Sequence, residues 1–289
     1  MRKKNSYDNM VFDHEAIRRF IGLIALLLPV AVVLSAWKIL DSISISYHTP
    51  TGFPFLPYFP TPRDIFVGAL FVIGAFLMSY RGRQYDQARK FWVWLQRFWS
   101  GAVNFGVEMR KREEDIVSTV GGIAAWLVAL FPTEEIKADG INAKPLITFG
   151  VDQGDVLTQV SHIHLVCAAI LFLTTVYFCF CAFIKRLKMK IDTRGPAGPW
   201  YSDPLNRRKI LYYISGGGIL LTLLFLLIMG ILDSLQHGII VIYNQTYWAE
   251  YVMLFLFGLA WLVASKPPGL IDPSEQEESK EESKNVLSE

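Results

Sequence analysis

Residues Ile17–Leu40 read IRRFIGLIALLLPVAVVLSAWKIL, and the polar stretch Asp41–His48, DSISISYH, follows directly. Between Arg19 and Lys38 the run holds no charged side chain. It is long enough for a helix that crosses the roughly 30 Å hydrocarbon core of a bilayer. The run is too long for the apolar region of a signal peptide, and no small-x-small cleavage site precedes Lys38. We therefore expect an uncleaved first membrane span.

Apolar runs of the same kind recur along the chain of 289 residues, 52% of which are hydrophobic. The six candidate spans are Ile17–Leu40, Asp64–Tyr80, Ile116–Phe131, Val160–Ile184, Ile210–Leu232 and Tyr247–Ala264. We predict an all-α polytopic membrane protein with six transmembrane helices in one domain, residues 1–265. The three cysteines all fall in the fourth run, where they form neither a disulfide framework nor a zinc motif.

The distribution of Lys and Arg predicts the orientation of these helices. Of 28 such residues, 24 fall in the N-terminal segment, in segments 81–115 and 185–209, and after Ala264. The remaining loops hold 3, and Lys38 lies at a helix end. Because basic residues concentrate in cytoplasmic loops, both termini are expected in the cytoplasm. We expect a multi-pass protein of the plasma membrane, the inner membrane of a bacterium.

Two segments outside the spans have amino-acid compositions that predict their structure. Residues 89–108 place aromatic side chains at helical spacing on one face, among Arg and Lys, which predicts an amphipathic helix in the cytoplasmic interface. The alternative is a soluble helical loop packed on the bundle. Residues 266–289 are rich in Glu and Ser and nearly free of apolar side chains, so we expect a disordered acidic tail.

The predicted topology brings several ionisable residues to the outer end of the bundle. We expect a binding pocket there, formed by Arg63, Asp64, His164, Asp233, His237 and Glu250. Arg63 or a protonated His164 would hold the carboxylates of Asp64 and Glu250. Asp233 ends a helix, where the dipole disfavours a carboxylate, and His237 four residues on is a suitable partner. For Asp64, capping of its own helix remains an equal alternative.

The same layer contains candidates for chemistry. His164 shares a helix face with small and polar residues, whereas His162 shares one with larger apolar residues, so His164 is the expected interior residue. His48, His164 and His237 are candidate ligands of Zn²⁺, although no H-E-x-x-H spacing is present. Ser44, His48 and Asp64 are candidate catalytic residues, without a nucleophile-elbow motif.

Several motifs resemble those of known membrane proteins. Ser42–Thr49 (SISISYHT), Arg63–Gly68 (RDIFVG), Tyr80–Gly82 (YRG) and Val128–Thr133 (VALFPT) resemble a bacterial family of uncharacterised six-helix membrane proteins. This resemblance implies the topology and little about mechanism. Ser44, His48 and Asp64 are loosely similar to the first elements of membrane hydrolases such as alkaline ceramidase, whose later H-x-x-x-H is missing here. DRAM-like six-helix proteins share the topology without transferable catalytic residues.

Three functions follow as hypotheses. The leading one is a membrane protein whose outward-facing polar pocket binds a lipid headgroup, an ion or a small solute. The second is a zinc-dependent membrane hydrolase acting on a lipid or an amide, as the looser resemblance implies. The third is a structural membrane scaffold. The lipid bilayer is the expected partner, nucleic acid is not, and the sequence leaves the ligand and the oligomeric state open.

Overall fold

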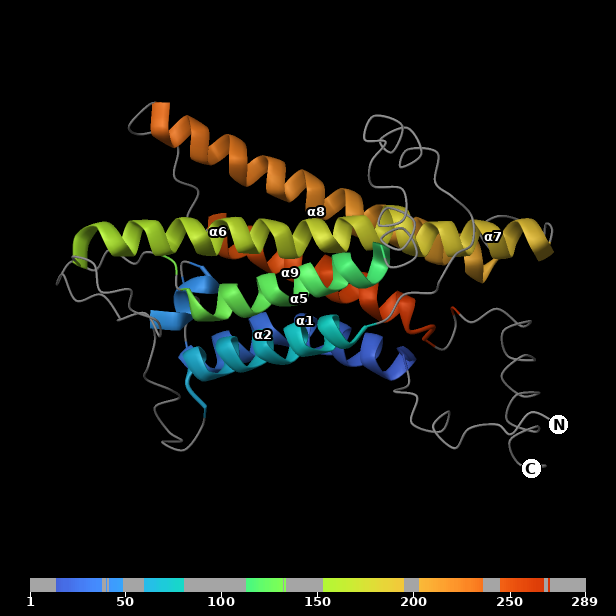
Figure 1. Cartoon of the computed structure of the whole chain (residues 1–289), viewed down its shortest axis with the longest axis horizontal. Coiled ribbons are helices and arrows are strands. Elements are labelled where there is room, and N and C mark those ends of the chain that lie inside the picture. Colours follow the sequence, from blue (N-terminus) through green and yellow to red (C-terminus); the bar gives the residue numbers. More distant parts are fainter. Residues whose placement is uncertain are drawn as a thin grey trace, which may run out of the picture.

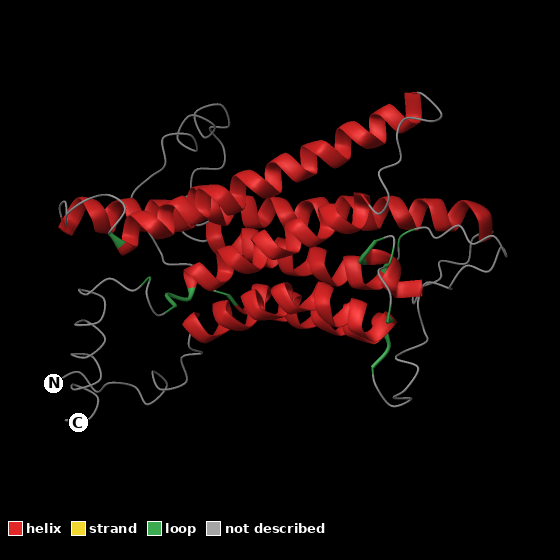
Figure 2. Ribbon diagram, turned by 180° about the vertical axis from the view of Figure 1, so that it is seen from behind, coloured by secondary structure: helices red, strands yellow, loops and turns green. Residues whose placement is uncertain are grey.

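The computed structural model describes residues 14–37, 40, 42–48, 60–80, 113–131, 133, 153–194, 203–235, 245–267 and 270. This part of the chain is helical and contains no β-strand (Figures 1 and 2). Its elements are α1 (His14–Ala36), the 3-10 turn η2 (Ser44–His48), α2 (Pro62–Ser79), α5 (Glu113–Leu130), α6 (Gln153–Tyr177), the π-helical turn η3 (Phe178–Phe183), α7 (Ile184–Arg194), α8 (Pro204–Leu235) and α9 (Gln245–Ala264). The prediction of an all-helical protein is confirmed for these residues.

Five helical segments are long and apolar enough to cross a membrane: Glu15–Ala36, Pro62–Ser79, His162–Thr193, Pro204–Leu232 and Gln245–Ala264. These are the helices of a multi-pass membrane protein. α5 is not among these five segments, and its first turn is occupied by Glu113, Glu114 and Asp115. Its charge-free part, Ile116–Leu130, is about 22 Å long at 1.5 Å per residue, less than the roughly 30 Å of a hydrocarbon core. A sixth span at α5, the orientation and the choice of membrane stay predictions.

The helices form a bundle in which α2 packs between α1 and α5, and α9 packs between α1 and α8. α5 packs in turn against α6. α8 contacts α6, η3 and α7, and it diverges from α6 toward its C-terminal end (Figures 1 and 2). One side of the bundle is therefore formed by two helices that separate along their length.

Glycines permit close backbone contact in two of these helix pairs. A Cβ added to Gly258 would lie 2.7 Å from the carbonyl oxygen of Gly22, and one added to Gly122 would lie 2.6 Å from that of Gly74. α9 on α1, and α5 on α2, thus approach as closely as glycine allows. Gly68 is different, because an added Cβ would meet nothing within 4 Å.

The helix Gln153–Arg194 is continuous through the π turn η3. Phe178 and Phe183 in this turn are buried, with ring centroids 5.2 Å and 5.7 Å from that of Trp261 in α9. A Cβ added to Gly216 of α8 would lie 2.9 Å from Cβ of Cys179. The π turn therefore fills the centre of the bundle and fits closely against α8.

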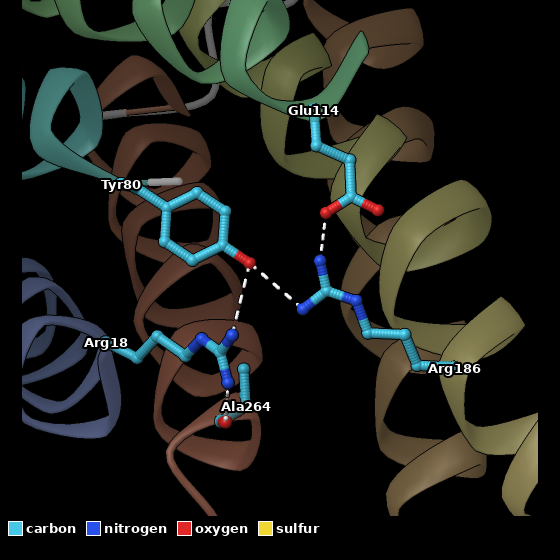
Figure 3. Close-up of polar contacts among 5 residues, drawn as sticks. All are labelled: Arg18, Tyr80, Glu114, Arg186 and Ala264. Atoms are coloured by element: carbon cyan, nitrogen blue, oxygen red, sulfur yellow. Dashed lines mark hydrogen bonds and ion pairs between the residues drawn. The ribbon is translucent and has the colours of Figure 1, made fainter. Parts of the chain in front are cut away.

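A polar cluster, here called the Arg18 end, ties five helical elements together (Figure 3). The Tyr80 hydroxyl accepts hydrogen bonds from Arg18 Nη2 at 3.2 Å and from Arg186 Nη1 at 3.1 Å. Arg18 Nη1 also donates to the carbonyl oxygen of Ala264 at 3.1 Å, and Arg186 forms an ion pair with Glu114. Glu114 precedes the charge-free part of α5. Burial raises the pKa of its carboxyl above the ordinary value, and Arg186 opposes that rise.

The predicted segments outside the spans are described only in part. Residues 89–108, the proposed interfacial helix, lie outside the described residues. Of the tail 266–289, the structure describes Lys266, Pro267 and Leu270. Lys266 Nζ lies 2.7 Å from Glu15 Oε1, so the start of the tail is attached to α1.

Candidate functional site

The end of the bundle opposite the Arg18 end carries a hydrogen-bonded carboxylate. Glu250 Oε2 accepts hydrogen bonds from Ser42 Oγ at 2.7 Å, Ile43 N at 2.5 Å and Ser44 N at 3.1 Å. Glu250 Oε1 accepts one from Ser44 Oγ at 2.6 Å. We call Ser42, Ile43, Ser44, His164 and Glu250 the Ser44–Glu250 site. It joins the chain after α1 to α6 and α9.

The local sequence explains why this carboxylate is held so closely. The N–H groups at the start of η2 have no partner within the turn and are available to a carboxylate, as at other helix starts. Ser42 and Ser44, two residues apart, add hydroxyl donors to the same acceptor. Glu250 lies in the second turn of α9, which begins at Gln245, so its carboxylate depends on these donors from the segment after α1. Together these groups replace the water that a carboxylate loses inside a membrane protein.

His164 extends the network to α5. Its side chain is 1% exposed, with Nδ1 2.6 Å from the carbonyl oxygen of Phe131 and Nε2 3.2 Å from Ser44 Oγ. A carbonyl oxygen only accepts, so Nδ1 carries a proton. The Ser44 hydroxyl has one proton, which it donates to Glu250 Oε1 over 2.6 Å. His164 Nε2 therefore either donates to Ser44 Oγ from an imidazolium or carries no proton in a neutral ring.

The structure places Arg63 and Asp64 in other contacts. The Arg63 guanidinium lies 4.5 Å from the ring centroid of Tyr47, and its Nη2 donates to the Tyr47 hydroxyl at 3.2 Å. Asp64 is exposed, and its Oδ2 accepts from Thr61 Oγ1 at 2.8 Å and Thr61 N at 3.2 Å. Thr61 Oγ1 accepts in return from Asp64 N, which completes a capping box on α2. In the described contacts Asp64 therefore caps its own helix instead of pairing with Arg63 or His164.

Other candidate residues lie outside what the structure describes. The backbone of His48 ends η2, but its side chain lies outside the described residues, as does that of Asp233 at the end of α8. His237 is entirely outside them. Among the side chains that are described, no group of three His, Cys, Asp or Glu is placed to hold a metal ion. The zinc hypothesis therefore rests on His48 and His237 joining His164, and it stays a prediction.

The Ser44–Glu250 site lines one end of a cavity of about 910 Å³. Ser44, His164 and Glu250 contribute its polar end, with His162, Gln245 and Thr246 nearby on α6 and α9. The apolar walls come from α1, α2, α5, α6, α8 and α9 and include Leu28, Phe66, Leu70, Val128, Leu171, Phe172, Leu223, Leu226, Met253 and Leu254. The cavity is thus polar at one end and hydrocarbon-like along its length.

The cavity reaches the surface of the bundle where α6 and α8 diverge. Leu165 of α6 lines it and is 57% exposed, and Leu227 and Ile231 of α8 line it and are 59% and 48% exposed. Gly230 lies between these α8 residues, and a Cβ there would meet nothing within 4 Å. Because both helices can cross a membrane, these apolar residues face lipid in a bilayer.

Sequence reasoning missed several parts of this site. Ser42, Ile43, Phe131 and Gln245 were not singled out, because a serine hydroxyl, a backbone N–H, a backbone carbonyl and a neutral amide leave no motif. His162 was not expected in the interior of the bundle; it is exposed and also lines the cavity. The alternation of serines at Ser42, Ser44 and Ser46 is the one signal that could have located the donors.

Comparison of the chain with protein-family models, with curated proteins and with solved structures found no match. The geometry of the Ser44–Glu250 site and its cavity is therefore the basis for a function.

Proposed function

We propose that this multi-pass membrane protein binds an amphiphile, a molecule with one hydrocarbon chain and a polar head, in the cavity beside the Ser44–Glu250 site. The observation that carries the proposal is the match between a long apolar wall and a small polar end. Of the ligands considered from the sequence, an ion or a small polar solute would leave most of the wall without a partner. A lipid-like molecule satisfies both parts of the cavity.

The proposed route of binding is sideways from the bilayer. Leu165, Leu227 and Ile231 line the cavity and are also exposed, so a chain could pass between α6 and α8 without crossing polar surface. A ligand that arrives from lipid gains little hydrophobic free energy, because its chain leaves one apolar environment for another. Selectivity must then come from the shape of the wall and from the polar end.

A cavity-filling substitution tests this proposal. The probe is a hexadecanol that carries a photoreactive diazirine, incubated with the full chain in phosphatidylcholine nanodiscs. Gly230→Phe should reduce saturable photolabelling at least fivefold, because Gly230 lines the cavity and a Cβ added there meets nothing within 4 Å, which leaves room for a ring in the ligand's space. Gly217→Phe on the same helix is the matched control, since a Cβ there also meets open space but Gly217 does not line the cavity. Equal labelling of both variants and the natural chain would refute the proposal.

One observation favours a second candidate function, hydrolysis. Ser44 Oγ lies 3.2 Å from His164 Nε2, and the Phe131 carbonyl orients the ring through Nδ1, as in a nucleophile with an oriented base. Against this, the Ser44 hydroxyl lies closer to Glu250, and Glu250 Oε2 already binds the N–H groups of Ile43 and Ser44 that could stabilise an oxyanion. Covalent labelling of the natural chain, but not of Ser44→Ala, by an alkyl fluorophosphonate would support hydrolysis.

The zinc-dependent form of this second function has its own test. Metal analysis of the purified protein would support it if stoichiometric zinc were present and were lost in both His48→Ala and His164→Ala. Purified protein that contains no zinc would rule out a zinc-dependent hydrolase. A scaffold role would instead be indicated if neither the amphiphile, the fluorophosphonate nor zinc bound.

A further inference from the structure

We infer that the head of the bound amphiphile is a hydrogen-bond donor, a hydroxyl or an ammonium group, and that anionic heads are rejected. This inference rests on the proposed function and adds the chemical class of the ligand. Its first basis is Glu250, whose side-chain oxygens act as acceptors in all of its described hydrogen bonds. From the described part of the chain, Oε2 accepts three hydrogen bonds, whereas Oε1 accepts one from Ser44 and has a second lone pair for another donor. Glu250 lines the cavity, so a bound head can supply the missing donor.

Gln245 supplies a second, independent acceptor. Its side-chain oxygen Oε1 is buried and accepts no hydrogen bond from the described part of the chain. Gln245 lines the same cavity at the start of α9, beside Thr246 and five residues before Glu250. A buried amide oxygen without a donor is unfavourable, so a ligand that donates to it gains free energy that an acceptor-only head cannot.

His164 does not offer a donor to an anionic head. Its Nδ1–H is used by the Phe131 carbonyl oxygen in both proton arrangements. When the ring is an imidazolium, the Nε2 proton goes to Ser44, and when the ring is neutral, Nε2 is itself an acceptor. The nitrogen nearest the site therefore never presents an unused N–H to the cavity.

The distribution of charge points the same way. No Lys or Arg is among the described residues that line the cavity, and Glu250 is their only carboxylate. Arg63 is occupied by Tyr47 through a hydrogen bond and a cation–π contact. Where Glu250 is ionised and the His164 ring is neutral, an anionic head would lie beside a like charge in surroundings that screen it poorly, whereas an ammonium would be attracted.

Four competitors with the same hexadecyl chain distinguish the effect of a hydrogen-bond donor in the head from the effect of its charge. Hexadecanol and hexadecylamine carry donor heads, hexadecyl sulfate is anionic, and hexadecyltrimethylammonium is cationic without a donor. Each competes with the photoreactive hexadecanol for the full chain in phosphatidylcholine nanodiscs. We expect the alcohol and the amine to compete about tenfold or more better than the sulfate, the factor that one hydrogen bond to a charged group provides. The amine should also exceed its trimethylated analogue.

The outcomes distinguish this inference from the proposed function. Saturable labelling that all four competitors displace equally, or that the sulfate displaces best, would overturn the donor-head inference and leave amphiphile binding intact. Absence of saturable labelling would overturn both. Displacement by both cations alike would show that charge alone selects the head, which also contradicts the inference.

Two variants locate the acceptors. Gln245→Leu removes an acceptor from the first residue of α9 without touching the hydrogen bonds of Glu250, and it should weaken the alcohol and amine severalfold while leaving the sulfate unchanged. Glu250→Gln should reduce the advantage of the alcohol and the amine over the sulfate, because the carboxylate charge is gone. If both variants kept the full preference for the alcohol and the amine over the sulfate, the assignment of these two acceptors would be contradicted.

Discussion

Ser44 Oγ and Glu250 Oε1 lie 2.6 Å apart, although 206 positions separate these residues in the chain. The contact fixes the segment after α1 against the start of α9. It also places a carboxylate next to His164 without a direct bond between them, since Ser44 stands between the two side chains. The stability of this end of the bundle and the recognition proposed for it depend on the same few groups.

Removing the carboxylate should destabilise the protein. Glu250→Leu leaves the N–H group of Ile43 and the hydroxyl of Ser42 without their acceptor, and each unpaired buried donor costs roughly 1–3 kcal/mol, so we expect a loss of about 3 kcal/mol or more. Glu250→Gln should cost less, because the amide oxygen still accepts. Thermal loss of monodisperse protein in detergent measures this effect, with Asp192→Leu on the exposed face of α7 as the control. A Glu250→Leu protein as stable as the control would contradict the assignment.

Ser44 and His164 should be energetically coupled. Ser44→Ala removes the hydroxyl that faces His164 Nε2, and His164→Ala removes the ring, so each change eliminates the same contact. In a double-mutant cycle the two effects on stability should differ from additivity by about 0.5–3 kcal/mol. Ser44 paired with the exposed Ser79 of α2 is the control cycle and should be additive. Additive effects for Ser44 and His164 would show that the 3.2 Å approach carries no energy.

The glycine contact between α1 and α9 predicts that the effect of a glycine-to-alanine substitution on stability depends strongly on its position. Gly258→Ala places a Cβ 2.7 Å from the backbone oxygen of Gly22, so α9 must move away and the protein should melt at a lower temperature. Gly68→Ala meets open space and should be neutral or should stabilise α2 by up to about 1 kcal/mol through helix propensity. A Gly258→Ala protein that melts like Gly68→Ala would contradict the close packing of α1 on α9.

At the Arg18 end, Tyr80 is expected to be the critical acceptor. Tyr80→Phe keeps the ring but leaves Arg18 and Arg186 without the shared hydroxyl, at an expected cost of about 1–3 kcal/mol. Tyr213→Phe on the exposed side of α8 should change stability by less than about 0.5 kcal/mol. Equal melting temperatures for the two variants would show that the guanidinium groups find other acceptors.

The predicted orientation has a direct test in intact cells. In a chain whose native cysteines are replaced by alanine, a cysteine at Thr51 or Gly140 should react with an impermeant thiol reagent added outside. A cysteine at Gly195 should react only after the cells are opened, because segment 185–209 is strongly basic. Labelling of Gly195 from outside would reverse the orientation and place the Ser44–Glu250 site at the cytoplasmic end.

Hydrophobic periodicity and length were sufficient to predict the helices. Each predicted apolar run is helical over most of its length, since a backbone inside lipid must satisfy its own hydrogen bonds. The number of spans was harder to predict, because the acidic first turn of α5 leaves a charge-free part shorter than a bilayer core. Helix bounds could not have been predicted to the residue: Gln153–Arg194 runs well beyond the apolar run Val160–Ile184.

The candidate site was predictable in its charged residues and not in its donors. His164 and Glu250 were singled out because ionisable groups within spans are costly, and the structure brings them to the same serine. The partners of Glu250 are backbone N–H groups and serine hydroxyls, whose roles depend on the turn η2 and not on residue type. Asp64 was also expected at the site, but a carboxylate in the first turn of a helix is equally suited to capping that helix, and the structure shows it in a capping box.

Photolabelling from two positions on one chain tests the central claim most directly. A hexadecanol with its diazirine next to the hydroxyl should label the polar end, at His162 or Thr246, and one with its diazirine at the far end of the chain should label Phe172 or Leu223. Leu223 lies about 13 Å along α8 from Leu232 at the polar end, so mass spectrometry of the labelled peptides separates the two depths. Labels confined to Leu221 and Phe225, which are exposed on α8 and do not line the cavity, or a reversed order of depths, would contradict the claim.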